Sequence, residues 1–251
     1  MQKREGSGWK LNKIPVLEIF GPTIQGEGMV IGRKTMFVRT AGCDYKCAWC
    51  DSSFTWDGSA KHEIKQMTAE DIWEQLYALG SDRFDHVTIS GGNPALLASL
   101  ASFISLCKEK NIQVALETQG SKWQEWFYEI DDLTISPKPP SSRMETNFGI
   151  LDEILAKLQA NSGNFSLKVV VFDEKDLEYA KTIHARYSNV PFFLQVGNDD
   201  IITNGNNEEL VMKLLEKYEW LIDQVMNSNE WKNVRVLPQL HAYVWGNKRG
   251  V

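Results

Sequence analysis

FVRTAGCDYKCAWCDS, residues 37–52, runs from an apolar segment straight into three closely spaced cysteines. Cys43, Cys47 and Cys50 share one short loop in the pattern C-x3-C-x2-C. The apolar residues before them favour a strand up to Thr40, so the cysteines follow its carboxyl end. In parallel α/β folds ligands bind at this end of the strands. The stretch therefore predicts a parallel α/β fold with its functional site at the carboxyl ends of the strands.

Strand-length apolar runs alternate with segments of helical period along the rest of the chain. Helices are expected from Thr68, where TAED is a capping-box-like start, and across 97–107. Near-continuous apolar strands separated by helices indicate a parallel sheet that is buried on both faces. We therefore expect an α/β fold, a partial (open) barrel of parallel strands with surrounding helices. The predicted strands are 16–20, 35–40, 86–90, 114–118, 133–136, 167–172, 192–196 and 234–238.

Polar motifs follow six of these predicted strands. Because the carboxyl ends of parallel strands lie at the same end of the sheet, the motifs are expected to come together at one opening of the barrel. They are AGC (41–43), GGNP (91–94), QG (119–120), PKPP (137–140), GND (197–199) and QLH (239–241).

Composition narrows the class of protein. Lys and Arg number 27 against 33 Asp and Glu, and a net charge of −6 gives no basic field for a nucleic-acid partner. No stretch of about 18 apolar residues and no signal-peptide core occur, so we expect a cytoplasmic protein with no membrane partner. We expect residues 1–251 to form a single domain, with 1–13 as a mobile tail.

The cysteine triplet predicts a metal site with an open position. Three thiolates in one loop suit a cuboidal iron–sulfur cluster that has one iron without a protein ligand. Structural zinc sites usually take two separated ligand pairs, and the sequence has no second pair. Cys107, on an apolar helical stripe, is interpreted as a small buried hydrophobe. A zinc-binding module with three cysteines and one histidine stays open as an alternative.

The triplet, with Trp49 directly before its last cysteine, resembles the signature of the radical S-adenosylmethionine (SAM) enzymes. In that superfamily SAM chelates the open iron through its amino and carboxylate groups. SGGNP (90–94) resembles the glycine-rich SAM motif, in which Gly92 permits close approach. That motif often reads Gly-Gly-Glu-Pro, so Asn93 is a departure: an amide must hydrogen-bond where a carboxylate would act by charge. Another radical SAM activity, such as activation of a protein glycine, remains a rival.

Motifs along nearly the whole chain narrow the resemblance. They are PTIQGEGMVIG (22–32), the stretch 37–52, VTISGGNPALL (87–97), ETQG (117–120), ISPKPPSS (135–142), LQVGND (194–199) and VRVLPQLH (234–241). Together they resemble the 7-carboxy-7-deazaguanine synthases, and TIQGEG (23–28) is the most specific of them.

This resemblance implies a lyase-type, ring-contracting activity in queuosine and deazapurine biosynthesis, the pathway of a tRNA modification. 6-Carboxy-5,6,7,8-tetrahydropterin would be converted to 7-carboxy-7-deazaguanine with loss of ammonia, after a 5'-deoxyadenosyl radical takes hydrogen from the pterin carbon that bears the carboxylate. The resemblance also implies a six-stranded partial barrel, a homodimer, a 4Fe-4S cluster, SAM and Mg2+. The chemistry implies flavodoxin or ferredoxin as electron donor.

Site residues are assigned by the same resemblance. Substrate-binding positions are Ile24, Gln25, Gly26, Glu27, Arg39, Ser90, Gln239 and His241, of which Glu27, Arg39 and His241 are expected to be catalytic. SAM-contacting positions are Trp49, Cys50, Asp51, Gly92, Glu117, Ser136, Pro137, Lys138 and Gln195. Cys43, Cys47 and Cys50 would hold the cluster, and Ser52 would bind Mg2+.

Two of these roles also have a direct physical basis. The Arg39 guanidinium suits a bidentate grip on the substrate carboxylate, and the Ser52 hydroxyl suits a hard cation. A structural ion pair for Arg39 and a backbone-bonding hydroxyl for Ser52 remain the alternatives.

Overall fold

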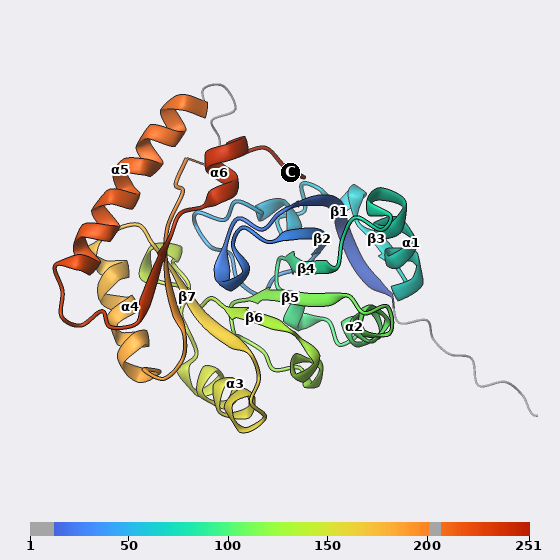
Figure 1. The fold of residues 1–251 in the computed structure, drawn as a ribbon, viewed down its shortest axis with the longest axis horizontal. Coiled ribbons are helices and arrows are strands. Elements are labelled where there is room, and N and C mark those ends of the chain that lie inside the picture. The colour runs from blue at the N-terminus through green and yellow to red at the C-terminus, as the bar shows by residue number, and fades with distance from the viewer. Residues whose placement is uncertain (1–12, 201–206) are drawn as a thin grey trace, which may run out of the picture.

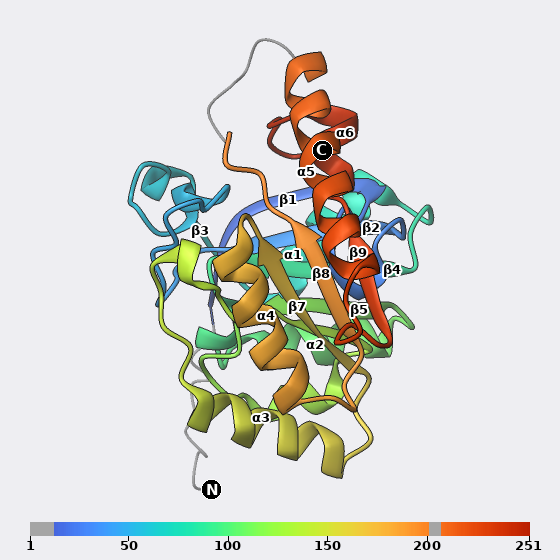
Figure 2. The same cartoon turned by 90° about the vertical axis from the view of Figure 1, so that its left-hand side faces the viewer.

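The computed structural model describes residues 13–200 and 207–251 and contains one curved sheet. Its nine strands lie in the order β3-β1-β2-β4-β5-β6-β7-β8-β9, and neighbouring strands from β2 to β9 are parallel. In the described part of the chain β9 pairs with β8 alone, so the barrel stays open. Helices surround its outer side (Figures 1 and 2). The predicted α/β open barrel is confirmed.

The elements have the following bounds. The strands are β1 (Ile14–Ile24), β2 (Lys34–Thr40), β3 (Lys65–Met67), β4 (His86–Gly91), β5 (Gln113–Thr118), β6 (Asp132–Ile135), β7 (Phe165–Val171), β8 (Phe192–Val196) and β9 (Val234–Leu237). The α-helices are α1 (Ala69–Gly80), α2 (Leu100–Glu109), α3 (Phe148–Ala160), α4 (Glu174–Arg186), α5 (Asn207–Met226) and α6 (Leu240–Trp245).

The first strand differs from the expectation of an all-parallel sheet. β1 pairs with β2 in the antiparallel sense, because residues 25–33 between them are too few for a crossover. The short strand β3, which was not predicted, pairs with β1 on its other side. The parallel part comprises β2 and β4 to β9, one strand more than the six that the resemblance implied, because β9 extends the sheet past β8.

Local sequence signals account for the start of α1. Thr68 Oγ1 accepts a hydrogen bond of 3.1 Å from the Asp71 backbone N–H, and the Asp71 carboxylate accepts one of 2.8 Å from the Thr68 N–H. This is the predicted capping box. Cys107 is fully buried in the core, as expected of a structural cysteine. Of the predicted mobile tail only Lys13 falls within the described residues, and its ammonium lies 3.7 Å from the Asp71 carboxylate.

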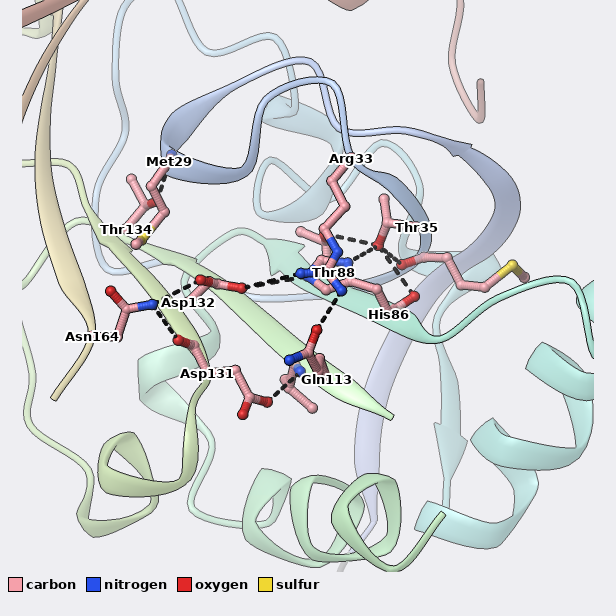
Figure 3. A network of polar contacts seen from close by, with 12 residues as sticks. Met29, Arg33, Thr35, His86, Thr88, Gln113, Asp131, Asp132, Thr134 and Asn164 are labelled. Atoms are coloured by element: carbon pink, nitrogen blue, oxygen red, sulfur yellow. Dashed lines mark hydrogen bonds and ion pairs between the residues drawn. The ribbon is translucent and has the colours of Figure 1, made fainter. Parts of the chain in front are cut away.

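A polar network at the amino ends of the parallel strands anchors the loop 25–33 (Figure 3). Arg33 Nη1 lies 3.8 Å from Asp132 Oδ2, and Arg33 Nη2 donates to the Gln113 side chain. Earlier in the loop, the Met29 N–H donates to Thr134 Oγ1 at 3.3 Å. The loop that begins with Gln25 is therefore tied to β5 and β6.

Candidate functional site

A cavity of about 310 Å3 lies where the carboxyl ends of the parallel strands meet the loop 25–33 and the cysteine loop. Nearly all the site residues that the resemblance assigned line this cavity; the exceptions are Pro137 and Gln195. The assigned residues that line it are Ile24, Gln25, Gly26, Glu27, Arg39, Cys43, Cys47, Trp49, Cys50, Asp51, Ser52, Ser90, Gly92, Glu117, Ser136, Lys138, Gln239 and His241.

The three cysteines of the triplet face this shared space as free thiols. Each is half-buried, unlike the fully buried Cys107. Burial raises the pKa of all three thiols, that of Cys47 to about 11. A metal that binds them as thiolates must therefore displace protons. Three thiols in the lining of one cavity fit a cluster that leaves one iron accessible.

Several buried polar atoms around the cavity have no hydrogen-bond partner among the described residues. They are Ser90 Oγ, Glu117 Oε1 and Gln239 Oε1 in the lining, and both amide atoms of Gln195. Gln195 lies in register with Val170, which does line the cavity. Because buried polar groups are nearly always hydrogen-bonded, this set fits a site that pairs with a polar ligand.

An ion-paired lysine that sequence reasoning missed lies at the floor of the cavity. Lys168 Nζ is 2.6 Å from Glu27 Oε2 and 2.8 Å from Glu117 Oε2, and its side chain is 3% exposed. It links the loop 25–33 to β5. A signal was present in the sequence: a charged residue inside the apolar run LKVVVF (167–172) needs a buried partner.

The charge states of Glu27, Glu117 and Lys168 follow from burial and from their mutual contacts. Burial alone would raise the pKa of Glu27, but Lys168 and His241 hold it well below its usual range, helped by a hydrogen bond of 2.9 Å from Gln239 Nε2. Burial raises the pKa of Glu117 despite Lys168. Burial opposes charge on Lys168, yet the two carboxylates raise the pKa of its ammonium. Glu27 is thus an ionised acceptor inside the cavity.

Close backbone approach fixes the position of the loop 25–33. The Leu240 N–H donates to Gly26 O at 3.0 Å, and a Cβ on Gly26 would come within 2.3 Å of His241 Nδ1. Only glycine fits this contact. His241 Nδ1 also lies 4.0 Å from Glu27 Oε1, so TIQGEG and QLH, far apart in sequence, form one wall.

Arg39 lines the cavity and already has protein partners. Its Nε donates to Glu18 Oε2 at 2.8 Å and its Nη1 to Ser52 Oγ at 2.9 Å. Its guanidinium lies 5.7 Å from the ring centroids of Phe20 and Phe54. The ion pair named as the alternative is therefore present, and the grip on a substrate carboxylate stays a prediction.

Oxygen ligands for a cation gather beside the cysteine loop. Ser52 Oγ donates to Asp51 Oδ1 at 2.9 Å. Ligand atoms of Glu27, Asp51 and His241 lie within 4.8 Å of one another. Carboxylate and hydroxyl oxygens are the ligands that Mg2+ prefers. The residues present fit Mg2+, and the role of Ser52 as its ligand stays a prediction.

The C-terminal segment 246–251 forms the outer wall of the cavity, which the sequence did not predict. Arg249 Nη2 lies 2.8 Å from Glu63 Oε2, Arg249 Nε donates to Glu18, and the guanidinium sits 4.1 Å from the Phe54 ring centroid.

No helix among residues 13–200 and 207–251 combines the length and apolar composition that crossing a membrane requires.

Comparison with known proteins agrees with this geometry. A model described as the radical SAM superfamily matches residues 37–137. The 7-carboxy-7-deazaguanine synthase of Bacillus cereus is 64% identical over 96% of this chain and 100% of its own length. That of Bacillus subtilis is 65% identical over 95% of this chain and 98% of its own. The crystal structure of QueE from Escherichia coli, 23% identical, has the same fold, with a TM-score of 0.64 over 91% of this chain and 95% of that one. The chain therefore belongs to the 7-carboxy-7-deazaguanine synthase family of radical SAM enzymes.

Proposed function

We propose that this chain converts 6-carboxy-5,6,7,8-tetrahydropterin to 7-carboxy-7-deazaguanine with loss of ammonia. The observation that carries the proposal is the meeting of three thiols, unpaired buried polar atoms and the ionised Glu27 in one cavity. Relatives that bear the name of this synthase are 64% and 65% identical over nearly the whole chain, which supports the same chemistry here.

Two bound groups would supply chemistry that amino acids lack. On Cys43, Cys47 and Cys50, a 4Fe-4S cluster with SAM on its open iron would supply the hydrogen-atom abstraction that begins the reaction. Held by the oxygens of Ser52 and Asp51, Mg2+ would neutralise the charge of the substrate carboxylate.

The chain itself binds and orients the substrate. Glu27, kept ionised, accepts N–H groups of the pterin, and the neighbouring Gln25 amide supplies both a donor and an acceptor. Arg39, which also lines the cavity, binds the carboxylate of the substrate in this arrangement. The segment 246–251 and the buried floor exclude water from a reaction that passes through radicals.

Loss of ammonia requires a proton for the departing nitrogen. His241 lines the cavity 4.0 Å from Glu27 Oε1, and an imidazole is the usual proton carrier near neutral pH. We assign His241 the role of proton donor.

The test is an anaerobic assay of the reconstituted enzyme with SAM, a reductant and the carboxy-tetrahydropterin. We expect a brown iron–sulfur chromophore, 7-carboxy-7-deazaguanine and an equal amount of ammonia. A colourless protein that holds one zinc would support the zinc-binding alternative. SAM cleavage without the deazaguanine product would support a different radical SAM activity.

We further propose that the enzyme acts as a homodimer, takes electrons from a flavodoxin or ferredoxin and works in the cytoplasm. Four free cysteines, three of them accessible, suit a reducing compartment.

For the dimer, α5 offers an apolar surface: Met212 and Leu215 lie on one face of the helix and are 58% and 46% exposed. The continuous sheet from β3 to β9 supports a single domain.

A further inference from the structure

The glycine-rich motif that follows β4 lies directly against the start of the cysteine loop. A Cβ on Gly92 would come within 2.2 Å of Gly42 O and 3.0 Å of Cys43 Cβ, so only glycine allows this packing. The Asn93 N–H donates to Gly42 O at 2.8 Å. The backbone after β4 therefore braces the loop at its first cysteine.

The side chain of Asn93 is fully buried and uses both ends of its amide. Its Oδ1 accepts from the Ala95 N–H at 3.2 Å and from Thr118 Oγ1 at 2.8 Å. Its Nδ2 donates to Asp44 Oδ1 and to Ser121 Oγ, each at 2.9 Å. Because the Ala95 N–H can only donate, the amide oxygen must face it and the amide nitrogen must face Asp44.

A second amide holds the same carboxylate. Gln119 Nε2, just after β5, donates to Asp44 Oδ1 at 2.6 Å and lies 3.7 Å from Cys43 Sγ. Asp44 is exposed on its outer side and follows Cys43 in the chain. Two neutral donors from adjacent strand ends thus grip the one carboxylate that stands beside the first cysteine.

We propose that Asn93 is a positioning residue for the cysteine loop, which it fixes by holding Asp44, and that this position requires an amide in this chain. An acid at position 93 would set two carboxylates at hydrogen-bonding distance, where they repel each other unless they share a proton. Asn93, which departs from Gly-Gly-Glu-Pro, and the acid at position 44 are then the donor and the acceptor of one hydrogen bond. The proposal rests on the proposed function only in that the loop binds the cluster.

The experiment measures hydrogen exchange of peptides covering residues 42–52 in the cluster-free protein. In Asn93→Asp we expect this exchange to be about five- to a hundredfold faster, because a buried partner of Asp44 is lost. In the double variant D44N/N93D the amide and the acid trade places, and exchange should return to within about threefold of the wild type. N147D is the matched control: the side chain of Asn147, like that of Asn93, accepts from a backbone N–H, here the Ile150 N–H at 3.2 Å at the start of α3.

Iron retention gives a second readout. After reconstitution, N93D should lose iron to a chelator faster than the wild type, and the double variant should recover. Unchanged loop exchange in N93D, or a double variant no better than the single one, would overturn the proposal. If hydrogen exchange in β7 also becomes faster in N93D, the variant Asp44→Ala is measured in its place, because Asp44 is exposed and its replacement leaves the fold intact. Unchanged exchange of residues 42–52 in Asp44→Ala would equally overturn the proposal. A wild-type protein that binds no iron contradicts the proposed function alone.

Discussion

At the scale of single residues, the charges beneath the cavity are arranged around Lys168. Its ammonium lies within 2.8 Å of carboxylates from two different elements, Glu27 in the loop 25–33 and Glu117 on β5. Breaking a buried ion pair by removing one partner leaves an uncompensated charge. Lys168 therefore decides both the stability of the floor and the ionised state of Glu27.

Replacement of Lys168 by Met tests this arrangement. We expect the free energy of unfolding to fall by about 3 to 5 kcal/mol, because two mostly buried carboxylates then face each other without a cation. Urea denaturation measures the loss. The control is Lys157→Met: its ammonium pairs with Glu153 on the solvent side of α3, and the change should stay within about 0.5 kcal/mol. Equal urea midpoints for the Lys168 variant and the wild type would refute the role.

His86 predicts a specific dependence of stability on pH. The ring is fully buried, with Nδ1 2.8 Å from Thr35 Oγ1 (Figure 3), and burial lowers its pKa to about 4. Between the unfolded value near 6.5 and about 4, the unfolded chain binds a proton that the folded chain does not. The contribution of His86, about 3 kcal/mol, is therefore complete above pH 6.5 and is lost as pH falls to about 4.

Unfolding of the His86→Gln variant across this range isolates the effect. The difference in unfolding free energy between wild type and variant should shrink as pH falls from 6.5 towards 4, because the variant lacks the titrating ring. A difference that stays constant over this range would show that His86 does not titrate as described.

At the scale of elements, the segment 246–251 closes the cavity over the cysteine loop. Arg249 bridges Glu18 on β1 and Glu63, and it stacks on Phe54 beside the cysteines. Because Glu18 also holds Arg39, this one arginine couples the segment to the wall that faces the substrate.

Substitution of Arg249 by Ala should loosen this closure. We expect the KM for the pterin to rise about fivefold, as partly exposed ion pairs contribute up to about 1 kcal/mol, while SAM cleavage without substrate changes little. Steady-state kinetics measures both values. The control is Arg186→Ala, whose guanidinium pairs with Asp152 on the outside of the barrel. A KM within error of the wild type would mean that the segment does not restrict the substrate.

At the scale of the whole molecule, the exposed apolar face of α5 predicts how two copies associate. The double variant M212D/L215D should yield a monomer where the wild type yields a dimer, because charges on this face oppose its burial. Light scattering after size-exclusion chromatography measures the mass. A variant that remains dimeric would place the interface elsewhere, and a monomeric wild type would contradict the dimer itself.

Periodicity and local motifs predict most of the barrel and the position of the site. Apolar runs located the eight main strands, and their carboxyl ends located the cavity, because a parallel sheet brings those ends together. Partners distant in sequence were missed. Glu18 and Glu63, which hold Arg249, lie 231 and 186 positions earlier, and no local pattern encodes such pairs. The antiparallel direction of β1 was missed for a similar reason, since apolar residues alone do not record strand direction.

The most direct test of the account compares two cysteine variants in the product assay. Cys47→Ala removes a thiol of the triplet, and Cys107→Ala removes one that is buried in the core. With SAM, reductant and 6-carboxy-5,6,7,8-tetrahydropterin, the wild type and the Cys107 variant should form 7-carboxy-7-deazaguanine and equal ammonia, and the Cys47 variant should form neither. Product from the Cys47 variant, or no product from a wild type that carries its cluster, would contradict the account.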